Sequence, residues 1–234
     1  MFAIYKKELR SFFVNPIGYV FVALFLAVSS LVFTYTTLNS GTCDLGSYYL
    51  IMLYMFAILI PLLTMRILSE EKKTKTEQLL LTSPVSLFSV IFAKYLAAFT
   101  LFAGTLLASC LNFVVLYFYG EPNTPVMFAT TLGILMIGSA FVAIGVFVSA
   151  CTENQLVSAL VTIVSILSTL VLSILAGYVN FTPLRVVMKW LSVFDRFSRF
   201  TTGYFDVVAL LYYISITVIF IFLTIRVYEK RRWE

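Results

Sequence analysis

Six uncharged stretches of this 234-residue chain are long enough to cross a membrane. A membrane-spanning helix needs about 20 mostly apolar residues to cross roughly 30 Å of hydrocarbon. Only 12% of the residues are charged and 61% are hydrophobic. Soluble domains contain about 25% charged and 45–50% apolar residues. The sequence therefore predicts an all-α membrane protein with one transmembrane domain over residues 1–234. The predicted spans are residues 17–38, 46–65, 95–119, 125–150, 155–178 and 207–226.

Several kinds of chemistry are excluded by what the sequence lacks. The chain contains no histidine, which excludes His-based catalysis, His-ligated zinc and His proton relays. Its three cysteines, Cys43, Cys110 and Cys151, are too scattered for a disulfide framework or a thiolate metal site. No G-x-x-x-x-G-K-S/T phosphate loop is present. We therefore expect no enzyme activity, no metal and no cofactor in this chain, and no nucleic-acid partner.

The distribution of lysine and arginine predicts the orientation in the membrane. These residues concentrate at the N-terminus, between residues 66 and 94, and at the C-terminus, although four more lie in segment 178–206, which six spans place outside. Cytoplasmic segments carry an excess of Lys and Arg, so we expect a multi-pass protein of the cell membrane with both termini in the cytoplasm. No charged residue lies near the middle of a predicted span. This absence disfavours a transporter coupled to protons or ions, which would bury charged groups there.

The N-terminus is amphipathic at helical spacing. Residues 2–13 place aromatic and apolar side chains on one face and basic side chains elsewhere, a pattern typical of a helix lying at the membrane surface. An ordinary positively charged flank of the first span is the alternative. The apolar face is formed by Phe2, Tyr5, Leu9, Phe12 and Phe13, and the basic residues are Lys6, Lys7 and Arg10.

The loop between the second and third spans contains a helix signature. Thr74 and Glu77 fit a capping box and Pro84 is a stop signal, so a short helix is predicted over residues 75–82. It carries Leu79, Leu80 and Leu81, and we interpret it as a coupling helix that inserts into a soluble subunit. The alternative is that these leucines pack onto the membrane bundle. The preceding charges, residues 70–73, are interpreted as a solvated run.

Five stretches of the chain are KKELRSFFVNPIGYVFVALF, EEKKTKTEQLLLTSPV, SACTENQLVSAL, FDRFSRF and FLTIRVYEKRRWE. They resemble type-2 ABC exporter permeases, in particular their gliding-motility-like branch. Two departures are Lys75, where the family usually has glycine, and an acidic position at Glu77 that is followed by Gln78.

This resemblance implies a bacterial permease subunit that forms the translocation path as a dimer with an identical or homologous second subunit. Two separate ABC ATPase subunits would bind ATP and magnesium and drive it. Thr74, Glu77 and residues 79–81 would then couple the permease to the ATPase. The alternative is a membrane module that does not transport but transmits the ATPase motion to another protein.

The fifth span carries one narrow polar stripe. Its members follow one another at steps of 4, 4, 3, 4 and 4 and so share one face of a helix. We interpret the stripe as lining the path of the cargo at the dimer axis. The alternative is that the hydroxyls bond to their own helix or join two helices. The stripe consists of Asn154, Ser158, Thr162, Ser165, Thr169 and Ser173.

Small residues mark one face of the fourth span. Gly138, Gly145 and Ser149 lie on the same side of the predicted helix. Small residues allow two helix backbones to approach closely in a membrane, so we expect close helix packing there.

A basic amphipathic helix is predicted between spans five and six, over residues 184–200 with at most one break. Its apolar side would enter the outer leaflet and its cations would stay among headgroups, where the helix would cap the mouth of the dimer. Two interpretations of the cations are open. They contact only lipid headgroups, or they gate or receive an anionic or amphipathic cargo at the exit. The residues proposed for this role are Arg185, Lys189, Trp190, Phe194, Arg196 and Arg199.

Overall fold

A computed structural model describes residues 1–39, 41, 45–76, 85–119, 123–179, 181–201 and 206–233, and all regular elements among them are helical. The elements of the first half are α1 (Phe2–Val14), α2 (Pro16–Phe33), the π-helical turn η1 (Thr34–Leu38), α3 (Gly46–Thr64), α4 (Ser69–Lys73), α6 (Leu87–Ser109) and the 3₁₀ segment η2 (Cys110–Val115). Those of the second half are α7 (Leu116–Tyr119), α8 (Thr124–Cys151), α9 (Gln155–Tyr178), α10 (Thr182–Leu191), α11 (Val193–Thr201) and α12 (Val207–Trp233).

Six of the described helical segments are long and apolar enough to span a membrane, which confirms the predicted number. The third begins at Leu87 instead of residue 95, because Lys94, which interrupts the uncharged stretch, is buried inside the bundle. The segments are Pro16–Leu38, Gly46–Lys73, Leu87–Phe118, Thr124–Cys151, Gln155–Tyr178 and Val207–Arg231.

The centre of the bundle is α8, against which α3, α6, α9, α11 and α12 all pack. Two of its glycines explain the tight fit. A Cβ atom at Gly138 would lie 2.1 Å from the ring of Phe102, and one at Gly145 would lie 2.2 Å from Oγ1 of Thr64. Real Cβ atoms do not approach so closely, so the prediction of close packing along this face of span four is confirmed.

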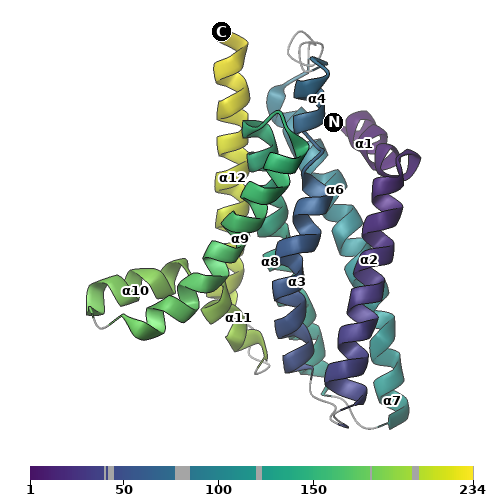
Figure 1. Ribbon diagram of the computed structural model, residues 1–234, viewed down its shortest axis with the longest axis vertical. Coiled ribbons are helices and arrows are strands. Elements are labelled where there is room, and N and C mark those ends of the chain that lie inside the picture. Colours follow the sequence, from purple (N-terminus) through teal and green to yellow (C-terminus); the bar gives the residue numbers. More distant parts are fainter. Residues whose placement is uncertain are drawn as a thin grey trace.

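Figure 1 shows how the termini and the connecting helices are arranged. Both termini lie at the end of the bundle that carries α4, while α10 projects sideways in the other half of the molecule. This arrangement agrees with two termini on the same side of a membrane. That this side is cytoplasmic stays a prediction from the charge distribution.

Candidate functional site

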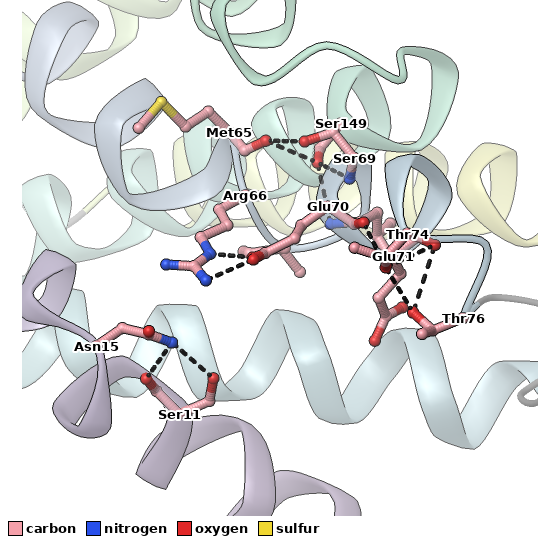
Figure 2. Close-up of polar contacts among 12 residues, drawn as sticks. Ser11, Asn15, Met65, Arg66, Ser69, Glu70, Glu71, Thr74, Thr76 and Ser149 are labelled. Carbon is pink, nitrogen blue, oxygen red and sulfur yellow. Dashed lines mark hydrogen bonds and ion pairs between the residues drawn. The ribbon is translucent and has the colours of Figure 1, made fainter.

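A polar junction surrounds α4 at the end of the bundle that holds the termini. A cavity of about 280 Å³ lies there between α1, α4 and α6, and both acidic and basic side chains line it. Figure 2 shows the polar contacts around α4, with Ser149 of α8 on one side and, on the other, Ser11 of α1 and Asn15, the C-cap of α1. The predicted coupling segment begins a few residues after α4, so this junction is the candidate functional site.

Lys94 of α6 connects three parts of this junction. Its side chain is buried, and Nζ donates hydrogen bonds to Glu71 Oε1 at 2.7 Å, Glu8 Oε1 at 3.0 Å and the carbonyl of Ile67 at 3.3 Å. An ammonium group has three N–H donors, so each of them has a partner. A buried charge is costly unless it is paired and hydrogen-bonded. Lys94 therefore fixes α1, the end of the second span and α6 to one another.

Ser149, near the end of α8, holds the start of α4. The backbone N–H groups of Leu68 and Ser69 donate to Ser149 Oγ at 3.1 and 3.0 Å, and this hydroxyl donates to the carbonyl of Met65 at 3.3 Å (Figure 2). The first N–H groups of a helix have no partner within the helix, and here a side chain from another span satisfies them. Lys72 adds a hydrogen bond from Nζ to the carbonyl of Ala150.

The interpretation of residues 70–73 as a solvated charged run is wrong for two of the four. Lys72 is buried against the end of α8, and Glu71 is largely buried beside Lys94. Glu70 forms an ion pair with Arg66 within the same segment, and Lys73 is exposed. The physical reason is that α4 packs between neighbouring helices, so that only one of its sides meets solvent.

The end of α4 corrects the predicted start of the coupling helix. Thr74 is the C-cap of α4, and its Oγ1 donates to the carbonyl of Glu70 at 2.9 Å instead of capping a following helix. Lys75 has φ 58°, the left-handed conformation that ends a helix. Its N–H bonds to the carbonyl of Lys72, and the N–H of Thr76 bonds to that of Glu71, each at 3.0 Å. This pairing is a Schellman motif, so no helix begins at residue 75. The remaining coupling residues, Glu77 and Leu79 to Leu81, lie outside the described part of the chain.

The polar stripe on α9 is divided among different environments. Ser158 and Thr162 are buried within the chain, whereas Ser165 and Thr169 border a cavity between α9 and α12. Asn154 Oδ1 accepts from the backbone N–H of Leu156 at 3.0 Å and caps the start of α9.

Most of the stripe hydroxyls are satisfied locally. Thr162 donates to the carbonyl of Ser158, Ser165 to that of Val161 and Thr169 to that of Ile166, each at 2.7 Å. These bonds are the ones that the alternative interpretation of the stripe describes. Ser173, in contrast, donates to Asp195 Oδ1 of α11 at 2.7 Å. A path-lining role is left as a prediction.

The predicted external helix consists of two helices, α10 and α11, with the break at Ser192. Arg185, Lys189 and Trp190 of α10 are exposed. The apolar side of α11 packs inside the protein, since Phe197 and Phe200 are fully buried. This part of the segment therefore does not enter lipid, contrary to expectation.

The cations of α11 have defined neighbours. Arg199 pairs with Asp206 at 2.8 Å, and Arg196 stacks on the ring of Tyr212. The side chain of Phe194 lies outside the described set.

One comparison identifies relatives of the chain. A family model described as ABC-2 family transporter protein matches residues 2–233. The match spans nearly the whole sequence and includes all six candidate spans and the junction around α4. No curated protein matches the chain.

Proposed function

Because the chain belongs to the ABC-2 family of transporter proteins, we propose that it is an exporter permease that separate ATPase subunits drive. Membership in the family, with six spanning helices, makes the chain a multi-pass membrane component of an ABC transporter. We add that it works as a dimer with an identical or homologous subunit. ATP and magnesium would bind to two partner ATPase subunits, since the sequence has no phosphate loop of its own.

The observation that supports this function most directly is the position of the α4 junction. The segment 77–84 follows α4 in the chain, and α4 is bonded to α8 through Ser149 and, through Glu71 and Lys94, to α1 and α6. A displacement of segment 77–84 by an ATPase would therefore act on several helices at once. Thr74, Glu77 and residues 79–81 keep the proposed coupling role, with Thr74 anchoring the segment to α4.

The remaining parts of the proposal concern orientation and path. We place both termini and α4 in the cytoplasm of a bacterial cell, and α10 and α11 toward the outside. Ser165 and Thr169 are the stripe residues best placed to border a path, because they line a cavity in this conformation. The gliding-motility-like branch stays an expectation from the resemblance.

Replacing two of the leucines tests the coupling role. Leu79→Asp together with Leu80→Asp would place charge in an apolar contact, so the candidate ATPase should be lost when the full chain is purified by affinity in detergent. Thr76→Asp is the matched control, because Thr76 is exposed and precedes the leucines. Retention of the ATPase by the double variant, with unchanged ATPase stimulation, would contradict the coupling role.

Flux through liposomes separates the proposed function from its alternative. The permease and its ATPase subunits are reconstituted together, and ATP-dependent movement of candidate cargoes is measured. Flux that stops in the Leu79→Asp, Leu80→Asp variant supports an exporter. ATPase stimulation without flux of any candidate cargo would instead favour a module that transmits motion to another protein.

A further inference from the structure

The helix α1 has two faces that meet different surroundings. Tyr5, Glu8 and Phe12 follow one another at steps of three and four, so they share one face. This face packs against the protein. Tyr5 OH donates to Thr100 Oγ1 of α6 at 3.3 Å, and Glu8 pairs with Lys94 at 3.0 Å. Phe12 packs on the core. The predicted N-terminal helix is therefore present, but only part of its predicted apolar face is exposed.

The opposite side of α1 carries two cations between two aromatic rings. Phe2, Lys6, Arg10 and Phe13 follow one another at steps of four, four and three, and all four are exposed. We refer to these four residues as the outer face of α1. Neither cation forms an ion pair with a described residue. A helix side that combines apolar rings with basic side chains is typical of contact with a membrane surface.

A sharp bend separates α1 from the first span. Asn15, between α1 and α2, is extended with ψ 148°. A Cβ atom at Gly18 would lie 2.3 Å from the carbonyl oxygen of Phe12, so glycine at this position lets the end of α1 fold closely against the first turn of α2. Figure 1 shows α1 at an angle to α2, beside the point where the first span begins.

An aromatic contact makes the outer face continuous with a lipid-facing part of α2. The rings of Phe13 and Tyr19 meet edge to face with their centres 5.6 Å apart. Tyr19 belongs to the first span and is 60% exposed, so its ring borders lipid in a membrane. Tyrosine is enriched at the boundary between membrane and water. The outer face therefore lies at headgroup level, and bilayer lipid is the partner beside it.

We propose that the outer face of α1 binds anionic phospholipids, and that this binding stabilises the α4 junction. Lipid phosphates would accept hydrogen bonds from Lys6 and Arg10, while Phe2 and Phe13 enter the region between headgroups and acyl chains. A cation near an anionic leaflet strengthens binding roughly fivefold. The binding does not depend on the proposed transport function, whereas its effect on ATPase coupling rests on that function.

Net charge distinguishes these lipids from zwitterionic ones. Phosphatidylglycerol carries a phosphate and no cation, so it attracts Lys6 and Arg10. In phosphatidylcholine a quaternary ammonium accompanies each phosphate and cancels this attraction. The apolar contacts of Phe2 and Phe13 are the same with both lipids, so the difference between the lipids measures the contribution of charge. An acidic protein surface would attract the same cations, but it gives no reason for exposed aromatic rings next to the first span.

Glu8 connects the bound lipid to the junction. Lys94 Nζ donates to Glu8 Oε1 at 3.0 Å and to Glu71 Oε1 of α4 at 2.7 Å. Lipid that holds α1 at the membrane surface therefore keeps Glu8 beside Lys94, and Lys94 in turn holds α4. Loss of anionic lipid should loosen α1 first and α4 through it.

Hydrogen exchange of the full chain in nanodiscs tests the proposal. The bilayer is either phosphatidylcholine or an equal mixture of phosphatidylcholine and phosphatidylglycerol with the same acyl chains, and no ATPase is present. Exchange of backbone amides reports the local opening of a helix. We expect exchange in residues 2–14 to be roughly tenfold slower in the mixture, and exchange in residues 69–73 to be slower as well.

Three double variants separate charge from other effects. Lys6→Gln with Arg10→Gln removes both charges but keeps good helix formers, so lipid composition should no longer change exchange in either segment. Arg185→Gln with Lys189→Gln is the matched control, because it removes two exposed cations from α10, and it should respond as the wild type does. Lys6→Arg with Arg10→Lys keeps both charges and should also respond.

Several outcomes would overturn the proposal. Equal exchange of residues 2–14 in the two bilayers would exclude selective lipid binding, and so would a response that persists without the charges of Lys6 and Arg10. A response in α1 that does not reach α4 would exclude the link through Glu8. Slower exchange of α1 only after the candidate ATPase is added would show that a protein covers the outer face. None of these measurements uses transport, so a failure of the proposed function would leave them unchanged.

Discussion

Lys75 adopts a left-handed backbone conformation at the end of α4, which costs any residue with a Cβ atom about 1–2 kcal/mol. Glycine adopts this conformation without that cost, although its unfolded chain has more freedom to lose. The family motif that the sequence resembles has glycine at this position. The structure therefore gives a physical reason for that preference and shows that Lys75 occupies the same turn at higher energy.

We predict that Lys75→Gly raises the free energy of unfolding by about 1 kcal/mol, because it removes the left-handed strain. Thermal unfolding in detergent measures the change. Lys73→Gly is the matched control, since Lys73 is exposed within α4 and glycine in a helix costs about 1 kcal/mol. A loss of stability in Lys75→Gly as large as that in Lys73→Gly would contradict the argument.

Asp206 caps the start of α12 and responds to pH. Its Oδ1 accepts from the N–H of Val208 at 2.9 Å, and its Oδ2 accepts from Arg199 at 2.8 Å. Desolvation raises the pKa of Asp206, but the hydrogen bonds from Arg199, Val208 and Ala209 outweigh it and hold the pKa below its ordinary value. A lowered folded-state pKa stabilises the fold above the unfolded pKa of about 3.9 and loses that contribution as the pH falls further.

The pH dependence of unfolding should therefore change in an Asp206→Asn variant. We expect the wild-type chain to lose stability relative to this variant as the pH falls below about 4, because the carboxylate of Asp206 takes up a proton and the asparagine does not. Asparagine can still cap the helix, so the two chains should share the same α12. Parallel stability curves over this range would show that Asp206 contributes no proton-linked stability.

At the scale of elements, α4 is a short helix whose two sides are tied to different spans. Buried ion pairs lose about 3–5 kcal/mol when one partner is removed, because the other charge stays buried and unpaired. Lys94 has two such partners, Glu8 and Glu71. The integrity of the junction should therefore depend on Lys94 more than on any exposed cation near it.

We predict that Lys94→Met lowers the free energy of unfolding by about 3–5 kcal/mol and reduces stimulation of the partner ATPase. Adding Glu8→Gln and Glu71→Gln to it should recover part of the stability, since the uncompensated carboxylates are then removed. Lys73→Met, on the exposed side of α4, is the matched control. Stability of Lys94→Met equal to that of the control would contradict the junction.

The six spans could be predicted from the sequence, but the junction could not. Span number and approximate bounds depend on a local property, the length of each apolar stretch. The partners of Lys94 and Ser149 depend on which helices pack together. Lys94 is 86 residues from Glu8 along the chain, and Ser149 is 81 residues from Leu68. The sequence predicts Lys94 at the end of a loop, because a charge inside a span is expensive. The sequence does contain one signal for this ion pair. A lone lysine, Lys94, lies next to an apolar stretch, and the amphipathic N-terminus contains an acidic residue, Glu8.

The predicted helix start at Thr74 was wrong because the same residue type suits both ends of a helix. Threonine can cap the start of one helix or close the end of another, and the capping-box pattern with Glu77 favours the first. The structure contains the second, because the backbone of residues 75 and 76 returns to α4. The stripe on α9 was likewise visible as a pattern, but whether each hydroxyl faces the interior, a cavity or α11 depends on tertiary packing.

At the scale of the whole molecule, the two halves differ in what they expose. The end with the termini carries α4 and the junction, whereas α10 projects from the other half (Figure 1). In the proposed orientation, Lys189 on α10 faces the outside of the cell and Thr76 faces the inside. Both residues are exposed, so a cysteine at either position is accessible to a reagent on its own side.

We predict that Lys189→Cys reacts with a membrane-impermeant thiol reagent applied to sealed cells, and that Thr76→Cys reacts only after the cells are opened. Both variants are made in a chain whose Cys43, Cys110 and Cys151 have been replaced. The reverse pattern would show that the orientation is inverted. Labelling of both cysteines in sealed cells would contradict six crossings with the termini on one side.

The bonds of Lys94 also have a consequence for biosynthesis. Lys94 is made 86 residues after Glu8, so α1 cannot reach its final position until the third span has left the ribosome. Before that point α1 can pack against α2 but not against α6, the other helix that it contacts. The final position of α1 is therefore completed only after the third span, which ends at Phe118, has been made.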